Sequence, residues 1–180
     1  VIAFAAAAQY APLDAVLPSA RLLVLLDGVE DPHNLGAILR SAHAAGASAV
    51  VIPERRAAPL TETVSKAAAG ALAYTPLVRV ANLNRALELL KQKGFWIYGL
   101  DQRGPLVYSE TNYSDPAALV FGAEGRGLHE QTRKHCDFLL RIPMAGQIAS
   151  LNVSVAAGIV LFDWLRKRPA PPDPSGHAAP

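Results

Sequence analysis

The 180-residue sequence predicts an α/β fold with a mostly parallel sheet and helices on both faces. Segments with strand-like apolar runs alternate along the chain with segments that have helical character, as in parallel sheets built from strand–helix units. The first run, LLVLL at residues 22–26, is apolar at every position, which is typical of a strand buried on both faces. A composition of 51% hydrophobic and 18% charged residues can form one well-buried domain and excludes a disordered chain.

Capping residues mark where the helices begin and end. Asn34 precedes a helix of small residues over 35–45, which stops at Gly46. Asn82 precedes an amphipathic helix that ends before Gly94. Further helices are expected over residues 61–72, 128–135 and 152–166, and strands over residues 22–26, 49–52, 77–80, 95–100, 119–121 and 138–142.

Composition divides the chain into three parts. Residues 1–20 are rich in alanine and contain two prolines, which indicates a linker or the end of a preceding unit. Residues 21–168 form the predicted domain, and residues 169–180 (PAPPDPSGHAAP) a disordered Pro-rich tail. The last helix of the domain is apolar nearly all round, so we expect it to be central or covered by a second subunit, and we favour a homodimer.

Net charge and cysteine content limit the classes of function that are open to this chain. A net charge of +2 excludes a general polyanion binder, so any RNA contact must be focal, through patches such as Arg55-Arg56 or Arg126 with Arg133-Lys134. A single cysteine fits a reducing cytoplasm and does not complete a zinc site, so we expect no metal. Neither a membrane-spanning run nor a signal peptide is predicted.

Three separate stretches place polar side chains beside apolar elements. They are residues 34–40 (NLGAILR), 122–128 (GAEGRGL) and 150–154 (SLNVS). Each combines glycine or serine with one strongly polar residue: Arg40, Glu124 or Asn152. In an α/β fold, the ends of neighbouring strands lie at one edge of the sheet, where ligands usually bind. We therefore expect the three stretches to form one site.

Each polar residue also has an ordinary structural interpretation. Arg40 is either a surface arginine or a clamp for a phosphate or oxyanion, for which its planar fork of donors is well suited. Glu124 either caps the helix over 128–135 or contributes to function. Ser150 and Asn152 either cap the last helix or help to bind an anion at its start.

Several reaction types lack their motifs. The glycine stretch is not followed by the Lys-Ser/Thr of a phosphate-binding loop and misses the G-x-G-x-x-G spacing, which disfavours a dinucleotide-dependent oxidoreductase. Neither a G-x-S-x-G elbow nor a paired-carboxylate motif is present, so acyl transfer and glycoside hydrolysis are poorly supported.

Together, LDGVEDPHNLGAILRSAHAAGA, LVFGAEGRGLHEQTRKHCDFLLRIPMAG and SLNVSVAAGIVLF resemble the three signature motifs of the SpoU (TrmH-type) RNA 2′-O-ribose methyltransferases, in order and spacing, over residues 22–168. The connecting text resembles the ribosomal branch, which methylates a guanosine in large-subunit rRNA. A tRNA-directed enzyme is the near alternative. A cofactor- or RNA-binding module that is inactive without a preceding domain is a further one.

The resemblance implies an S-adenosylmethionine-dependent domain whose C-terminal part forms a deep trefoil knot, in a homodimer with its site at the subunit boundary. It also implies a small RNA-binding domain ahead of this one. Carried over residue by residue, it assigns catalysis to Arg40, Asn34, Glu124, Ser150 and Asn152. Cofactor contacts, largely through the main chain, are expected at Gly122, Ile142 and Leu151.

The expected chemistry is transfer of a sulfonium methyl group to a ribose 2′-hydroxyl. Because a guanidinium with a pKa above ~12 is a poor base, we expect Arg40 to hold the neighbouring phosphate and to stabilise the developing alkoxide. Glu124 and Asn152 are expected to orient Arg40 and the ribose.

Overall fold

A computed structural model of the chain describes residues 9–168. The Pro-rich tail expected over residues 169–180 and the first part of the expected linker lie outside the described residues. The described chain forms one seven-stranded sheet with the strand order β3-β2-β1-β6-β4-β7-β5, and every pairing between these strands is parallel. This confirms the predicted α/β class with a parallel sheet, whereas the trefoil knot and the homodimer stay predictions.

The strands are β1 (Leu22–Asp27), β2 (Ala49–Pro53), β3 (Leu77–Val80), β4 (Trp96–Leu100), β5 (Leu106–Val107), β6 (Ala117–Gly122) and β7 (Phe138–Arg141). The α-helices are α1 (Leu13–Val16), α2 (Pro32–Ala44), α3 (Glu62–Ala67), α4 (Leu83–Gln92), α5 (Glu130–His135) and α6 (Val153–Lys167). Three short 3-10 helices, η1 (Leu17–Ser19), η2 (Ala71–Ala73) and η3 (Tyr108–Glu110), lie in the connections.

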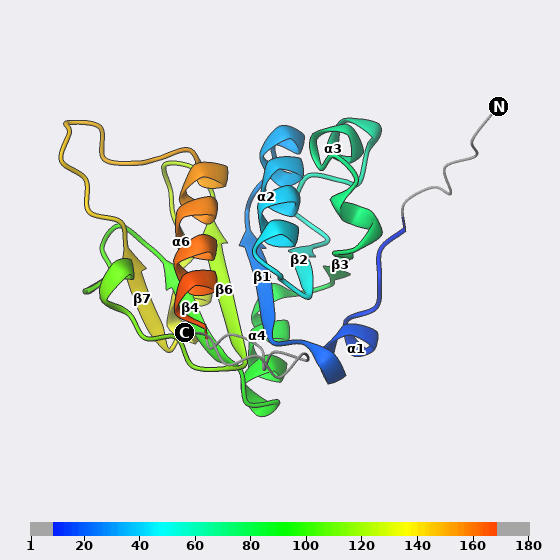
Figure 1. The fold of residues 1–180 in the computed structure, drawn as a ribbon, viewed down its shortest axis with the longest axis horizontal. Helices are drawn as coiled ribbons and strands as arrows, with labels where there is room; N and C mark the ends of the chain where they lie inside the picture. The colour runs from blue at the N-terminus through cyan, green and yellow to red at the C-terminus, as the bar shows by residue number, and fades with distance from the viewer. Residues whose placement is uncertain (1–8, 169–180) are drawn as a thin grey trace, which may run out of the picture.

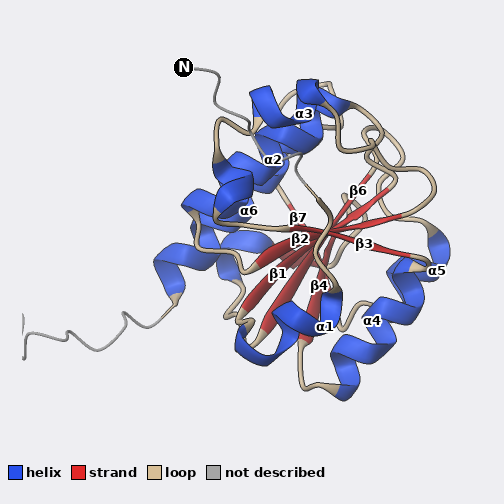
Figure 2. Cartoon of the chain, turned by 90° about the vertical axis from the view of Figure 1, so that its right-hand side faces the viewer, coloured by secondary structure: helices blue, strands red, loops and turns tan. Residues whose placement is uncertain are grey.

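The helices cover the sheet in two layers. Figure 1 shows α2, α3 and α6 in front of the strands, and Figure 2 shows α1, α4 and α5 on the other side. Successive residues of β1 alternate between the two cores: Leu22 and Val24 pack under α2 and α6, whereas Leu23 and Leu25 pack on the α4 side. A strand buried on both faces must therefore be apolar throughout, as the sequence of β1 indicated.

The helix boundaries differ from the sequence prediction at two places. Asn34 was expected to cap the second helix, but the cap is Asp31, whose side chain accepts hydrogen bonds from the backbone N–H groups of His33 (2.7 Å) and Asn34 (3.2 Å). Pro32 occupies the first helical position, where its missing N–H costs nothing. The helix expected over 61–72 is interrupted at Gly70, which adopts a φ of 86°.

Residues 9–20 of the expected linker pack against the sheet. The backbone N–H of Ala11 donates to Leu77 O at 2.9 Å, and the hydroxyl of Tyr10 accepts from the backbone N–H of Leu60 at 2.8 Å. The domain division at residue 20 stays a prediction, but much of this segment belongs to the folded unit.

The sheet has a topological switch point between β1 and β6. After β1 the chain continues to α2 and β2 on one side, whereas after β6 it continues to α5 and β7 on the other. Asp27, the last residue of β1, is in register with Gly122, the last residue of β6. Open α/β sheets bind ligands outside the carboxyl ends of their strands at such a point.

Candidate functional site

A cavity of about 410 Å³ lies at the carboxyl ends of β4 and β6. This volume falls within the range typical of small-ligand pockets. Three segments far apart in the sequence line it: residues 100–103 after β4, residues 121–127 around the glycine stretch, and residues 149–151, 153 and 156 at the start of α6. The second and third expected motifs therefore share one cavity.

The glycine stretch, residues 122–128, folds tightly back on itself. The backbone N–H of Gly127 donates to Ala123 O at 2.9 Å, and Gly127 has a φ of 69°, in the left-handed region. A Cβ added at Gly122 would lie 2.1 Å from the carbonyl carbon and oxygen of Gly127. Because the obstruction is backbone, only glycine at position 122 permits this close approach.

Asp101 fixes Arg103 at the wall of the cavity. Asp101 is only 3% exposed, and its carboxylate accepts from the Nε (3.0 Å), Nη2 (2.9 Å) and backbone N–H (2.9 Å) of Arg103. The side-chain hydrogen bond from Arg103 holds the pKa of Asp101 below its usual value, despite the opposing effect of burial. The carboxylate therefore stays ionised near neutral pH and keeps the guanidinium in place.

Asn152 links the starts of the two helices α2 and α6. Its Nδ2 donates to Asn34 Oδ1 at 3.0 Å, while its Oδ1 accepts from the backbone N–H of Ser154 at 2.9 Å and from Ser154 Oγ at 2.6 Å. Asn152 thus caps α6 and also contacts the first motif. The capping interpretation of this residue is confirmed, and anion binding at the start of α6 stays a prediction.

The structure brings most of the expected site residues together. Gly122, Glu124, Ser150 and Leu151 line the cavity. The Asn34–Asn152 pair lies beside it, since Asn152 falls between the lining residues at 151 and 153. Glu124 does not cap α5, which begins after His129 with no side-chain cap.

Arg40 and Ile142 lie outside the cavity lining. Arg40 is exposed on α2, and Asn152 contacts Asn34 instead of Arg40. Ile142 is buried directly after β7. Within one chain, the expected contacts of Glu124 and Asn152 with Arg40 are therefore not formed.

Sequence reasoning missed the segment after β4. Asp101, Gln102 and Arg103 line the cavity, and they directly follow an expected strand. A run of polar residues at the carboxyl end of a parallel strand is the signal that could have identified them.

No group of three His, Cys, Asp or Glu side chains within residues 9–168 could hold a metal ion. Over the same residues, no helix has the length and hydropathy that crossing a bilayer requires.

Known proteins resemble this chain in both sequence and fold. The SpoU rRNA Methylase family matches residues 21–162. The 23S rRNA (guanosine-2′-O-)-methyltransferase RlmB of Pseudomonas syringae pv. tomato is 51% identical over 149 residues, which is 83% of this chain and 60% of that protein. The chain thus spans less than two thirds of this relative's length.

Two solved structures illustrate the structural likeness. The AdoMet-bound rRNA methyltransferase from Sinorhizobium meliloti superposes with a TM-score of 0.82 at 32% identity, over 90% of this chain and 62% of that one. The TrmH/SpoU tRNA modifying enzyme of A. aeolicus superposes with a TM-score of 0.73 at 32% identity, over 82% of this chain and 75% of that one. From the matched motifs and this shared fold, the chain belongs to the SpoU rRNA Methylase family.

Proposed function

We propose that this chain is the catalytic domain of an S-adenosylmethionine-dependent RNA 2′-O-ribose methyltransferase that acts on a guanosine in large-subunit rRNA. The observation that carries the proposal is the single cavity lined by Gly122, Glu124, Ser150 and Leu151, which come from two of the three family motifs. RlmB relatives near 51% identity support the rRNA guanosine as target.

The cavity suits a molecule that combines an aromatic ring with charged and polar ends. Leu100, Phe121 and Val153 supply apolar walls, and Arg103 and Glu124 supply opposite charges. The close approach of Gly122 to Gly127 leaves main-chain groups as the wall on that side. When bound there, S-adenosylmethionine supplies a methyl group carried on a sulfonium.

The residues of the chain would then position and stabilise the reacting ribose. The 2′-oxygen must lie in line with the methyl carbon, and alignment alone can lower the barrier by several kcal/mol. The Asn34–Asn152 pair would provide a polar edge beside the cavity for this purpose. Arg40 would hold the adjacent phosphate and stabilise negative charge as the 2′-oxygen develops it.

We also infer that the active enzyme is a homodimer. Val155 and Phe162 on α6 are 51% and 48% exposed, and with Ile159 they form one apolar stripe at helical spacing. Arg40 lies outside the cavity of its own chain, so a second copy that covers this face could place its Arg40 at the shared site. We propose the trefoil knot because the chain belongs to this family. We propose a cytoplasmic location because the proposed substrate is rRNA.

Two alternatives follow from particular observations. The A. aeolicus relative is a tRNA modifying enzyme, so a tRNA target is the second candidate. The chain spans 60% of the RlmB relative, so a module that binds cofactor or RNA without transfer on its own is the third.

The test is transfer of labelled methyl groups from S-adenosylmethionine to purified 23S rRNA or bulk tRNA, with Lys93→Ala as a charge-matched control for Arg40→Ala. We expect label in rRNA and a loss of at least 100-fold in Arg40→Ala only. Cofactor binding without transfer to either RNA would favour the inactive module. Preferred transfer to tRNA would favour the second candidate.

A further inference from the structure

A second hollow, the arginine groove, lies on the other side of the glycine stretch from the cofactor cavity. It has a volume of about 450 Å³ and opens at the carboxyl ends of β1, β2 and β3, beside the starts of α4 and α5. Its lining includes Arg55 and Arg56 after β2, Asn82 and Asn84 at α4, and Asp27 with His129. It therefore adjoins the same switch point as the cavity.

A chain of hydrogen bonds holds one arginine of the groove in place. Asp27, 7% exposed, accepts from the backbone N–H of His129 (2.8 Å, to Oδ2), and its Oδ1 lies 2.9 Å from His129 Nδ1. The other ring nitrogen, Nε2, lies 3.3 Å from Arg56 Nη1. Because a guanidinium can only donate, Nε2 must accept, and the ring proton is therefore on Nδ1, donated to Asp27.

The backbone of Arg56 points to a role beyond packing. Arg56 has a φ of 59°, which is a left-handed conformation that costs about 1–2 kcal/mol for a residue with a side chain. Such conformations persist where the surroundings impose them, and they cluster at binding sites. Arg56 is nevertheless exposed, so burial of its side chain does not explain the conformation.

The groove presents two exposed guanidinium groups and an amide donor. Both arginines are exposed, and Asn82 Oδ1 accepts from the backbone N–H of Arg85, which leaves its Nδ2 to donate. Of the two carboxylates in the lining, Asp27 is engaged by His129, and Glu130 lies 3.8 Å from Lys134. A ligand with several anionic oxygens fits this arrangement best.

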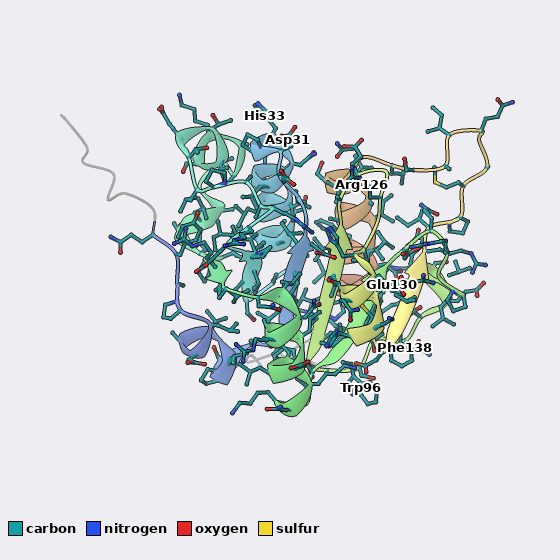
Figure 3. The ribbon with its side chains drawn as sticks, turned by 180° about the vertical axis from the view of Figure 1, so that it is seen from behind. Asp31, His33, Trp96, Arg126, Glu130 and Phe138 are labelled. Atoms are coloured by element: carbon teal, nitrogen blue, oxygen red, sulfur yellow. The ribbon has the colours of Figure 1, made fainter. Side chains whose placement is uncertain are left out.

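The groove and the cavity are lined by neighbouring segments of the chain. Figure 3 shows Arg126 of the glycine stretch at the same end of the molecule as Asp31 and His33 of the first motif, with Trp96 and Phe138 at the opposite end. Residues 121–127 line the cavity, and the directly following residues 129–132 line the groove. A strand whose target ribose lies at the edge of the cavity would therefore pass close to the groove.

We propose that the arginine groove binds phosphates of the RNA strand that flanks the methylated nucleotide, with Arg55 and Arg56 as the phosphate contacts. Asp27 and His129 are positioning residues that orient Arg56. That the bound strand is the substrate RNA rests on the proposed function. The test of the groove, however, does not depend on methyl transfer.

The test measures binding of the chain to a fluorescently labelled, single-stranded RNA of mixed sequence, by anisotropy between about 50 and 200 mM KCl. We expect Arg55→Ala and Arg56→Ala each to weaken binding about fivefold at the lowest salt and to reduce the slope of log K against log[salt] by about 0.7. Lys93→Ala, which removes the same charge at the other end of α4, should change neither quantity.

A second pair of variants separates orientation from charge. His129→Gln keeps an acceptor for Arg56 and should retain most of the affinity, whereas His129→Ala should resemble Arg56→Ala. Equal effects of Lys93→Ala and the arginine variants would overturn the proposal, and so would undetectable RNA binding at the lowest salt. S-adenosylhomocysteine affinity, measured alongside by calorimetry, should be unchanged in Arg55→Ala. If wild-type chain failed to bind S-adenosylhomocysteine, the proposed function would fail, while the RNA result would still decide the groove.

Discussion

Gly122→Ala is the most direct perturbation of the cavity at β4 and β6, because it adds one methyl group at the point of closest backbone approach. The added Cβ would lie 2.1 Å from Gly127 C and O and 2.4 Å from Leu128 N. Ordinary contacts between non-bonded carbon atoms are about 3.5–4.0 Å, so the two backbone segments must separate by about 1.5 Å. The wall formed by residues 122–127 would move by a similar amount.

The displacement has two measurable consequences. Forcing a methyl group into a packed site costs about 1–3 kcal/mol, which corresponds to a fall in Tm of about 2–12 °C for a domain of this size. Because the glycine stretch is one wall of the cavity, we also expect affinity for S-adenosylhomocysteine to fall by at least tenfold, or about 1.4 kcal/mol.

Differential scanning calorimetry and isothermal titration with S-adenosylhomocysteine measure these quantities. Gly146→Ala is the matched control, because no atom lies within 4 Å of its added Cβ and its φ is not left-handed. We expect Gly146→Ala to retain the wild-type Tm and affinity. If Gly122→Ala behaved like Gly146→Ala in both assays, the glycine stretch would not be a rigid wall, and the reasoning would be refuted.

Four further predictions concern single side chains. Arg40→Ala should reduce methyl transfer at least 100-fold, which corresponds to about 2.7 kcal/mol. Because Arg40 lies outside the cavity lining, S-adenosylhomocysteine affinity should not change, and weaker cofactor binding in calorimetry would contradict this. Asn152→Ala removes the cap of α6 and its bond to Asn34, so urea unfolding should show a loss of about 1–2 kcal/mol, and a wild-type midpoint would argue against the linkage. Burial raises the pKa of the Cys136 thiol to about 12, so as pH rises the unfolded chain loses this proton before the folded chain does. The free energy of unfolding should therefore fall above about pH 8.5, and should fall less steeply in Cys136→Ala. The lowered pKa of Asp101 stabilises the folded chain above about pH 3.9, and this stability is lost as pH falls through the pKa of Asp101 in the folded chain. In Asp101→Asn, the free energy of unfolding should therefore lack this part of its pH dependence.

The sequence predicted the strands because burial on both faces leaves a strong local signal. Each expected strand is present within a few residues, and the apolar run of β1 is typical. Short elements left no such signal: α1 is four residues long, and β5 has two residues. The start of α2 was misplaced because Asp31 and Asn34 are both good capping residues, and only Pro32 at the first helical position distinguishes them.

The site was predictable where a motif stays local. The glycine stretch and the start of α6 form one cavity because both lie at the carboxyl edge of the sheet. The contact of Asp27 with His129 joins residues 102 positions apart, and no local pattern indicates such a pair. The location of Arg40 outside the cavity depends on where α2 packs, which residue spacing does not specify.

Digestion of the methylated RNA to nucleosides, followed by mass spectrometry, tests most directly whether this fold delivers a methyl group to ribose. With wild-type chain, labelled S-adenosylmethionine and 23S rRNA, the label should appear as 2′-O-methylguanosine, and its yield should fall at least 100-fold when Arg40 is replaced by alanine. Label on the base of a nucleoside, or an equal yield from the variant, would contradict the assignment.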